Sequence, residues 1–258
     1  MFALTDAQIT ALVGQYFWPL ARISGFMLAA PIFGTRVITA RVRLLLSVML
    51  TLLVAPLLPP LPAVDGISLS MLVITLQQVL MGLTLAFIYQ VVFQIFVLAG
   101  QYIAMKMGLG FASMNDPANG VTVTILSQFY LLVTTLLFLS INGHLVLLQV
   151  IVNSFTLVPI GTPGLTGDQF YTVTALGGWM FGNALVIALP VLTALLLVNI
   201  AFGIMSRAAP QINIFAVGFP ITLIFGLLLM WLGFGAFLPA FEDFVSQGFT
   251  LGEQLLLR

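Results

Sequence analysis

The chain has 258 residues, of which 61% are hydrophobic and only 5% are charged, and its cations and acids balance to a formal net charge of zero. Typical soluble proteins carry about 25% charged residues, so this composition excludes a soluble globular fold and indicates an integral membrane protein. The zero net charge says nothing about nucleic acid, but the sequence has no basic patch that could bind phosphates, and the lack of cysteine excludes disulfides and thiolate metal sites.

Six stretches are apolar enough to form membrane-spanning helices, which need roughly 20 mostly apolar residues. In chain order they are Ala11–Phe33, Leu44–Leu61, Leu69–Ala99, Val121–Val150, Leu176–Met205 and Ile214–Phe237. Asp6 stands where a secretory signal would carry cations, so the first stretch is expected to be a retained helix. The sequence therefore predicts an all-α integral membrane protein with one domain over residues 1–258 and no separate soluble domain.

The cations fall in alternate connections between these stretches. The first, third and fifth connections hold Arg36, Arg41, Arg43, Lys106 and Arg207, whereas the second and fourth hold Asp65 and Asp168 without a cation. Because Lys and Arg accumulate in short cytoplasmic loops, both termini are expected outside and the connection around Lys106 inside.

Polar side chains interrupt the first, third and fourth stretches. A charge at the position of Arg22 costs about 2.5–3.5 kcal/mol to insert, so Arg22 is expected to face protein or water. An anchor bonded to backbone carbonyls is favoured over a direct functional role. Two stripes of polar residues are predicted to join helices, with lining of a wet pathway as the alternative. Their members are Gln90, Gln94 and Gln101, and then Gln128, Thr135 and Asn142.

Prolines mark the last two stretches. Pro190 lies in the middle of the fifth stretch and Pro220 near the start of the sixth, and each is expected to kink or break its helix. Gly178 and Gly182 form a small-residue pair that suits close helix packing. A second non-helical break is predicted between the two stretches, where protein or water must shield the backbone. Its residues are Arg207, Pro210, Gln211, Asn213 and Pro220.

The segment Gly100–Gly120 combines a helical first half with a second half rich in turn formers. Its methionines offer a pliable apolar surface, and its glycines offer backbone freedom. An ordinary connection between two membrane helices would explain this composition. The alternative is a mobile apolar plug beside a protein-lined cavity. The plug residues would be Met105, Met107, Gly108, Gly110, Phe111, Met114, Asp116 and Pro117.

No catalytic constellation emerges from the sequence. His144 is the only imidazole, and no acid lies inside a predicted span. A nucleophilic site would need a base beside Ser or Thr, and an ion-coupled carrier would be expected to bury an acid near the bilayer midplane. We therefore expect a protein that is not an enzyme, with no catalytic residues, no metal and no cofactor.

Five short runs, spread in order along nearly the whole chain, carry a family resemblance. They are Tyr16–Arg22, Gln101–Pro117, Asn142–Leu145, Leu157–Gly161 and Ala209–Pro220. No single run is specific, but their combination resembles the FliR family of the bacterial flagellar type III export apparatus, which has counterparts in injectisomes. The chain is more similar to the flagellar branch.

The resemblance implies a multi-pass protein of the bacterial inner membrane, in the flagellar basal body. It implies a FliP-like part joined to a FliQ-like part, with one FliR closing a ring of several FliP and FliQ copies. FlhB would associate with this core, and unfolded flagellar substrates would pass through it.

In the family, the loop that matches Met105–Asn119 projects into the pore and helps to close it. The family also implies that the helices do not all cross the bilayer as simple spans. A small-solute permease and a non-pore scaffold subunit remain the alternative functions.

Overall fold

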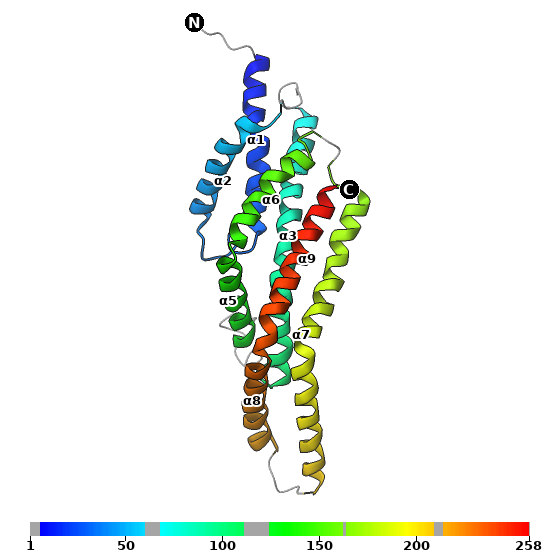
Figure 1. Ribbon diagram of the computed structural model, residues 1–258. Helices are drawn as coiled ribbons and strands as arrows, with labels where there is room; N and C mark the ends of the chain where they lie inside the picture. The colour runs from blue at the N-terminus through cyan, green and yellow to red at the C-terminus, as the bar shows by residue number, and fades with distance from the viewer. Residues whose placement is uncertain (1–5, 60–67, 111–123, 162–163, 209–213, 258) are drawn as a thin grey trace. The chain divides into compact units, whose positions relative to one another are not determined.

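The computed structural model describes residues 6–59, 68–110, 124–161, 164–208 and 214–257, and the regular structure within them is entirely helical (Figure 1). This confirms the all-α prediction. The helices are α1 (Asp6–Ala29), α2 (Ala40–Val54), α3 (Leu69–Lys106), α5 (Ile125–Ser140), α6 (Gly143–Leu157), α7 (Gly167–Ala208), α8 (Ile214–Gly233) and α9 (Phe237–Leu257). Short 3-10 turns occupy Ala55–Leu57 and Phe234–Ala236.

Four helical stretches in the described residues are long and apolar enough to cross a membrane: Ala40–Leu57, Leu69–Lys106, Gly167–Ala208 and Val217–Leu256. The bent pair α5 and α6, joined at 72°, would make a fifth. The structure therefore confirms an all-α integral membrane protein, with four or five such stretches in the described residues where about six were predicted. Helix α1 is not among these stretches, because Gln15 and Arg22 lower its hydropathy.

The fourth predicted span is broken rather than continuous. Helix α5 ends at Ser140 and α6 begins at Gly143, with Asn142 in the left-handed region at φ 58°. Asparagine tolerates this conformation better than most residues. Gly143 lies against the ring of Phe138, and a Cβ atom added at Gly143 would lie 2.6 Å from the ring carbon Cζ. Glycine is therefore the residue that lets the chain turn closely around this ring.

The prolines were expected to kink or break their helices, and neither of them breaks its helix. Helix α7 continues through Pro190 to Ala208, so Arg207 lies in its last turn, and α8 continues through Pro220. An unpaired backbone group costs several kcal/mol in an apolar environment, so a helix that loses one bond at a proline is better than an open loop. Hydroxyls also supply bonds nearby, since Thr193 donates to the carbonyls of Leu189 and Pro190. Pro210, Gln211 and Asn213 lie outside the described residues.

Helix α9 continues the chain beyond the sixth predicted stretch, which ends at Phe237. Phe237, Phe241 and Phe244 recur at helical spacing, and all three side chains are buried. Their rings gather around Phe96 of α3, with centroid distances of 5.0, 6.0 and 6.1 Å. Glu242 and Asp243 occupy the exposed side of the same turns. The acids therefore mark the polar face of an amphipathic helix.

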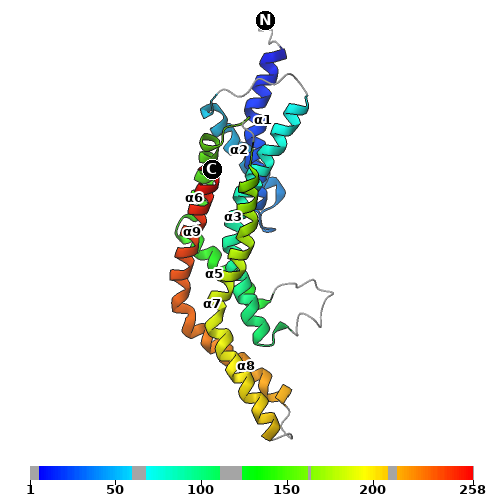
Figure 2. The same cartoon turned by 90° about the vertical axis from the view of Figure 1, so that its right-hand side faces the viewer.

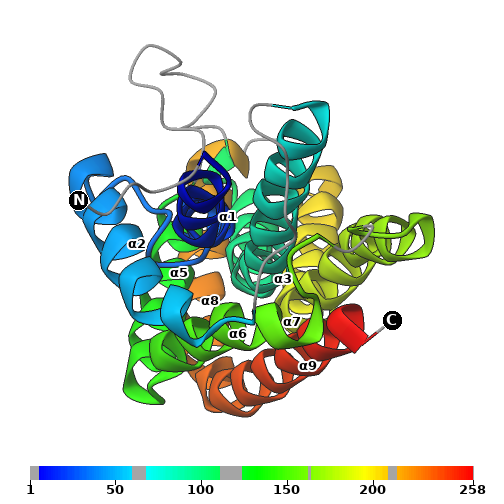
Figure 3. The ribbon, with the colours of Figure 1, turned by 90° about the horizontal axis from the view of Figure 1, so that it is seen from above.

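Contacts divide the chain into two units, each assembled from separate segments. The first unit comprises Met1–Val91, Phe138–Leu176 and Gln247–Arg258, and the second comprises Val92–Leu137 and Gly177–Ser246. In the first unit, α1 packs between α2 and the first half of α3 (Figure 3). In the second unit, the last turn of α3 lies against α8 (Figure 2).

Candidate functional site

The first unit buries the guanidinium of Arg22, whose side chain is 1% exposed. Nε donates to Gln78 Oε1 at 2.8 Å, and the terminal nitrogen Nη2 donates to the same oxygen. Nη1 donates to the carbonyl oxygen of Ser154 at 2.8 Å and to its hydroxyl at 3.2 Å. Nη2 also donates to the carbonyl of Val158 at 2.9 Å, and the ring centroid of Phe155 lies 4.4 Å from Cζ. We call these residues the Arg22 cluster.

The Arg22 cluster provides hydrogen-bond acceptors for the guanidinium of Arg22 without any carboxylate. A guanidinium has five N–H donors, and five hydrogen bonds to neutral acceptors are made. The carbonyl dipoles and the face of the Phe155 ring stabilise the positive charge. Arg22 therefore has no free donor to offer a ligand, and the arrangement connects α1, α3 and α6.

Glycine allows the close helix crossing on which this cluster depends. Gly82 of α3 lies directly against the backbone carbonyl of Arg22, and a Cβ atom there would collide with that oxygen. Gly25 of α1 faces the backbone of α3 in return, since its Cβ would lie 2.8 Å from the carbonyl oxygen of Val79. Small residues at both faces bring the backbones of α1 and α3 together.

The predicted amide anchors fall in different environments. Gln90 and Gln94 are half-buried on α3, whereas Gln128 and Asn142 are exposed. Gln101 bonds to α5, as described below. Sequence reasoning missed Gln78 and Ser154, the side chains that bind Arg22. Gln78 was visible as an amide inside the apolar third stretch, but nothing local in the sequence linked it to α1.

Methionine and glycine connect the C-terminal end of α3 to α8. The Met107 side chain is 0% exposed and lies over Gly226, where an added Cβ would be 2.6 Å from Met107 Cγ and 2.8 Å from Sδ. The hydroxyl of Thr222 donates to the Phe219 carbonyl of its own helix at 3.0 Å and also lies 3.5 Å from the Met107 carbonyl. Gly108 follows with φ +87° and packs against the ring of Phe219. We call this arrangement the Met107 socket.

The predicted plug residues therefore divide into groups. Met105 is 61% exposed, whereas Met107 is held inside the chain. Gly108 and Gly110 lie at the turn that follows α3. Phe111, Met114, Asp116 and Pro117 lie outside the described residues.

The start of α5 is bonded to α3 as well. Gln101 Oε1 accepts from the backbone N–H of Thr124 at 3.2 Å and from the hydroxyl of Ser127 at 3.0 Å. Thr124 Oγ1 accepts from the N–H of Ser127 at 3.3 Å, in the manner of a helix N-cap. Gly100 packs against this turn, since its Cβ would lie 2.9 Å from Ser127 Cα. Met107 and Gly108, which precede segment 111–123, are thus held by α8, and Thr124, which follows it, is bonded to α3.

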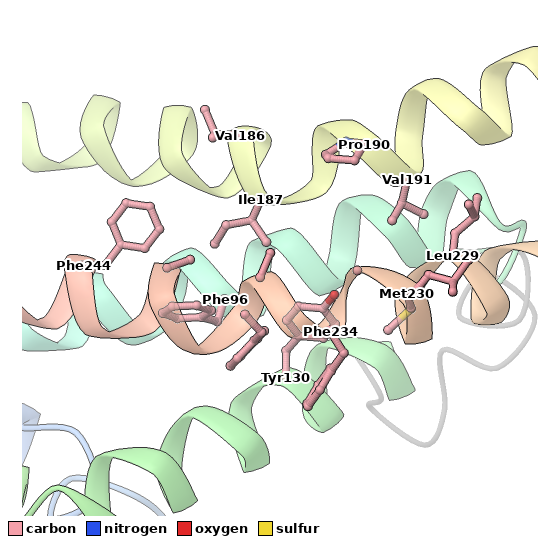
Figure 4. A pocket seen from close by; sticks show the side chains of 15 residues that line it. Phe96, Tyr130, Val186, Ile187, Pro190, Val191, Leu229, Met230, Phe234 and Phe244 are labelled. Atoms are coloured by element: carbon pink, nitrogen blue, oxygen red, sulfur yellow. The ribbon is translucent and has the colours of Figure 1, made fainter.

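The second unit also contains an apolar cavity of about 520 Å³ (Figure 4). Its walls come from α3, α5, α7, α8 and α9, and Tyr130 is the only polar side chain among the lining residues. Figure 4 shows aromatic side chains such as Phe96, Phe234 and Phe244 around it. These walls provide no acid or base. In the part of the chain that the structure describes, no three His, Cys, Asp or Glu residues form a group that could hold a metal ion.

Known proteins resemble the chain over nearly its whole length. Residues 13–248 match the family described as bacterial export proteins, family 1. The flagellar biosynthetic protein FliR of Pectobacterium carotovorum subsp. carotovorum is 38% identical over 248 residues, covering 95% of this chain and 93% of that protein. FliR of Escherichia coli (strain K12) is 38% identical over 251 residues, covering 97% and 96%.

A more distant relative gives the same result. FliR of Aquifex aeolicus (strain VF5) is 29% identical over 245 residues, which cover 88% of this chain and 92% of that protein. All three relatives are named as flagellar biosynthetic proteins, and none is named as an enzyme. The chain therefore belongs to the FliR family of bacterial export proteins and is a component of the flagellar export apparatus.

Proposed function

We propose that this protein is a core subunit of the flagellar type III export gate in the bacterial inner membrane. With FliP and FliQ it forms the channel through which unfolded flagellar substrates leave the cytoplasm, and FlhB binds to this core. The observation that carries the proposal is the match to FliR of Escherichia coli (strain K12), which is 38% identical over 97% of this chain. No catalytic step is required of such a subunit.

The exposed surface of α7 supports association with other helices. Val186, Leu197 and Ile204 are large apolar side chains that the chain itself leaves uncovered. On the same helix, a Cβ added at Gly178 or Gly182 would meet no atom within 4 Å. Small residues that no helix of this chain covers allow a helix of another subunit to approach closely. FliP, FliQ and lipid together would cover this surface.

Met105–Asn119 acts, in this proposal, as the plug of the channel. Met105, Phe111 and Met114 supply apolar side chains to a narrow lumen, and hydrophobic constrictions block ions by excluding water. Thioether chains can repack around the varied side chains of an unfolded substrate. The support from the structure is indirect: the Met107 socket and the Gln101 bonds hold both flanks of segment 111–123.

Deleting Gly110–Met114 tests this proposal. We expect the complex co-purified with FliP and FliQ to assemble with unchanged mass but to conduct small ions when it is reconstituted in a planar bilayer. Val37→Ser, at a side chain that is 90% exposed, is the control, and the channel should remain closed to small ions in this variant. A deletion complex that assembles and stays closed would overturn the plug assignment.

Crosslinking separates the channel from its alternatives. A stalled export substrate should crosslink to a photoreactive residue at position 105, whose side chain is exposed. Crosslinks to FliP and FliQ without any to the substrate would favour a scaffold subunit. Transport of a small solute by the isolated chain would favour a permease.

A further inference from the structure

We propose that Met107 and Gly226 are positioning residues, through which α8 sets the place and direction in which the chain leaves α3 toward the pore-closing segment. This inference rests on the proposed plug function and goes beyond it. It assigns Met107 to the contact with α8 that positions the plug, and not to the plug surface that faces the lumen. The structure supports it in three steps.

The first step is the fit of one side chain on one glycine. Cγ, Cε and Sδ of Met107 all lie within 2.8 Å of the position that a Cβ at Gly226 would take. Real Cβ atoms essentially never approach another atom so closely, so any residue other than glycine at 226 must displace Met107. Gly226 is itself buried, which leaves the thioether no open space directly beside it.

The second step is that one face of α8 holds the end of α3. Phe219, Thr222 and Gly226 stand at i, i+3 and i+7, which places them on the same side of a helix. The Phe219 ring packs on Gly108, and the Thr222 hydroxyl, which donates to the Phe219 carbonyl of its own helix at 3.0 Å, also lies 3.5 Å from the Met107 carbonyl. Met107 directly follows α3, which ends at Lys106, so its carbonyl accepts no bond within that helix. A shift of α8 therefore has to move Met107 and Gly108.

The third step is the geometry with which α3 ends. The N–H of Leu109 donates to the carbonyl of Ala104 at 3.0 Å, and the N–H of Gly108 donates to that of Met105 at 3.1 Å. With Gly108 at φ +87°, these bonds form a Schellman motif, which fixes the direction in which a chain leaves a helix. The exit direction is thus defined relative to α3, and α8 holds the same residues.

The decisive experiment compares two Gly→Ala substitutions on α8 in the assembled complex with FliP and FliQ. Gly226→Ala should raise the ion leak by about tenfold, because overpacking displaces Met107 and shifts the population away from the closed arrangement. Gly233→Ala is the matched control, since its Cβ would meet no atom within 4 Å, and it should not leak. The double variant Gly226→Ala with Met107→Ala restores the space and should return the leak most of the way to the wild-type level.

The outcomes separate this inference from the plug proposal. If deleting Gly110–Met114 causes a leak but Gly226→Ala does not, the positioning role is overturned and the plug stands. If neither causes a leak in an assembled complex, both fail. If the complex that contains Gly226→Ala does not assemble, Thr222→Val tests the positioning role instead, because it removes the hydroxyl donor at nearly constant volume. A wild-type conductance in Thr222→Val would then overturn the positioning role.

A labelling measurement tests the socket without any conductance. Because the chain has no cysteine, single-cysteine variants report on one site at a time. Met107→Cys should react with a maleimide about tenfold more slowly than Met105→Cys, since residue 107 is 0% exposed and residue 105 is 61% exposed. Adding Gly226→Ala to Met107→Cys should leave its reaction slow, because the shorter side chain still fits. Equal rates at residues 105 and 107 would contradict the socket.

Discussion

The Arg22 cluster and the Met107 socket join helices in opposite ways. The Arg22 cluster uses a buried charge and five directional hydrogen bonds. The Met107 socket uses a thioether on a glycine and a single hydroxyl contact of 3.5 Å. A helix that moves away from Arg22 leaves a buried charge short of acceptors, which is costly. A displacement at Met107 loses non-directional contacts and one long hydroxyl contact, so it costs less than a displacement at the Arg22 cluster.

The largest effect is expected for Arg22→Gln. The shorter neutral side chain cannot reach Gln78, Ser154 and Val158 together and leaves buried polar groups unpaired, at about 3–5 kcal/mol of stability. The measurement is the temperature at which half of the detergent-solubilised chain aggregates. Arg36→Gln, at an exposed cation, is the control and should change this temperature little. Equal temperatures for the two variants would show that the Arg22 cluster does not hold the first unit together.

A smaller loss of stability is expected for Gly82→Ala. The added methyl group meets the backbone carbonyl of Arg22, which cannot rotate away as a side chain can, and such overpacking costs about 1–3 kcal/mol. Gly177→Ala is the control, because its Cβ would meet no atom within 4 Å and alanine favours a helix. The same aggregation temperature should fall for the first variant and hold or rise for the second. A rise for both would contradict the close crossing of α1 and α3.

The smallest effect on overall stability is expected for Gln101→Leu, and it should be local. The backbone N–H of Thr124 and the hydroxyl of Ser127 lose their acceptor, at about 1–2 kcal/mol. Amide hydrogen exchange should accelerate in the first turn of α5 and remain unchanged around Arg22. Gln128→Leu, at an exposed amide in the first turn of α5, is the control. If Gln101→Leu destabilised the chain as much as Arg22→Gln, the contrast between the two regions would be wrong.

Local patterns in the sequence predicted part of this structure well. Composition alone predicted an all-α membrane protein, and the start of α3 at Leu69 agrees with the predicted span. The cost of burying Arg22 in lipid predicted that it would face protein or water, although it could not identify Gln78 as the partner. These successes depend on properties that each segment carries by itself.

The misses arise where distant or competing effects decide. Proline at positions 190 and 220 predicted a kink or a break, and neither helix breaks, because the backbone bonds of the surrounding helix outweigh the single bond that each proline removes. The helix α9 that carries Glu242 and Asp243 was not among the predicted stretches, although the flanking Phe241 and Phe244 are buried on its apolar face. The Met107 socket needs a glycine from a helix far along the chain, and no window of sequence contains both.

Gly226 has an evolutionary consequence as well as a mechanical one. Because a methyl group at 226 and a thioether at 107 compete for the same space, neither position is free to drift alone. Natural variants that acquire alanine or serine at 226 should carry a shorter side chain at 107 in the same genome. Correlated substitution at positions 107 and 226 among relatives would then be evidence for the contact between α8 and the end of α3.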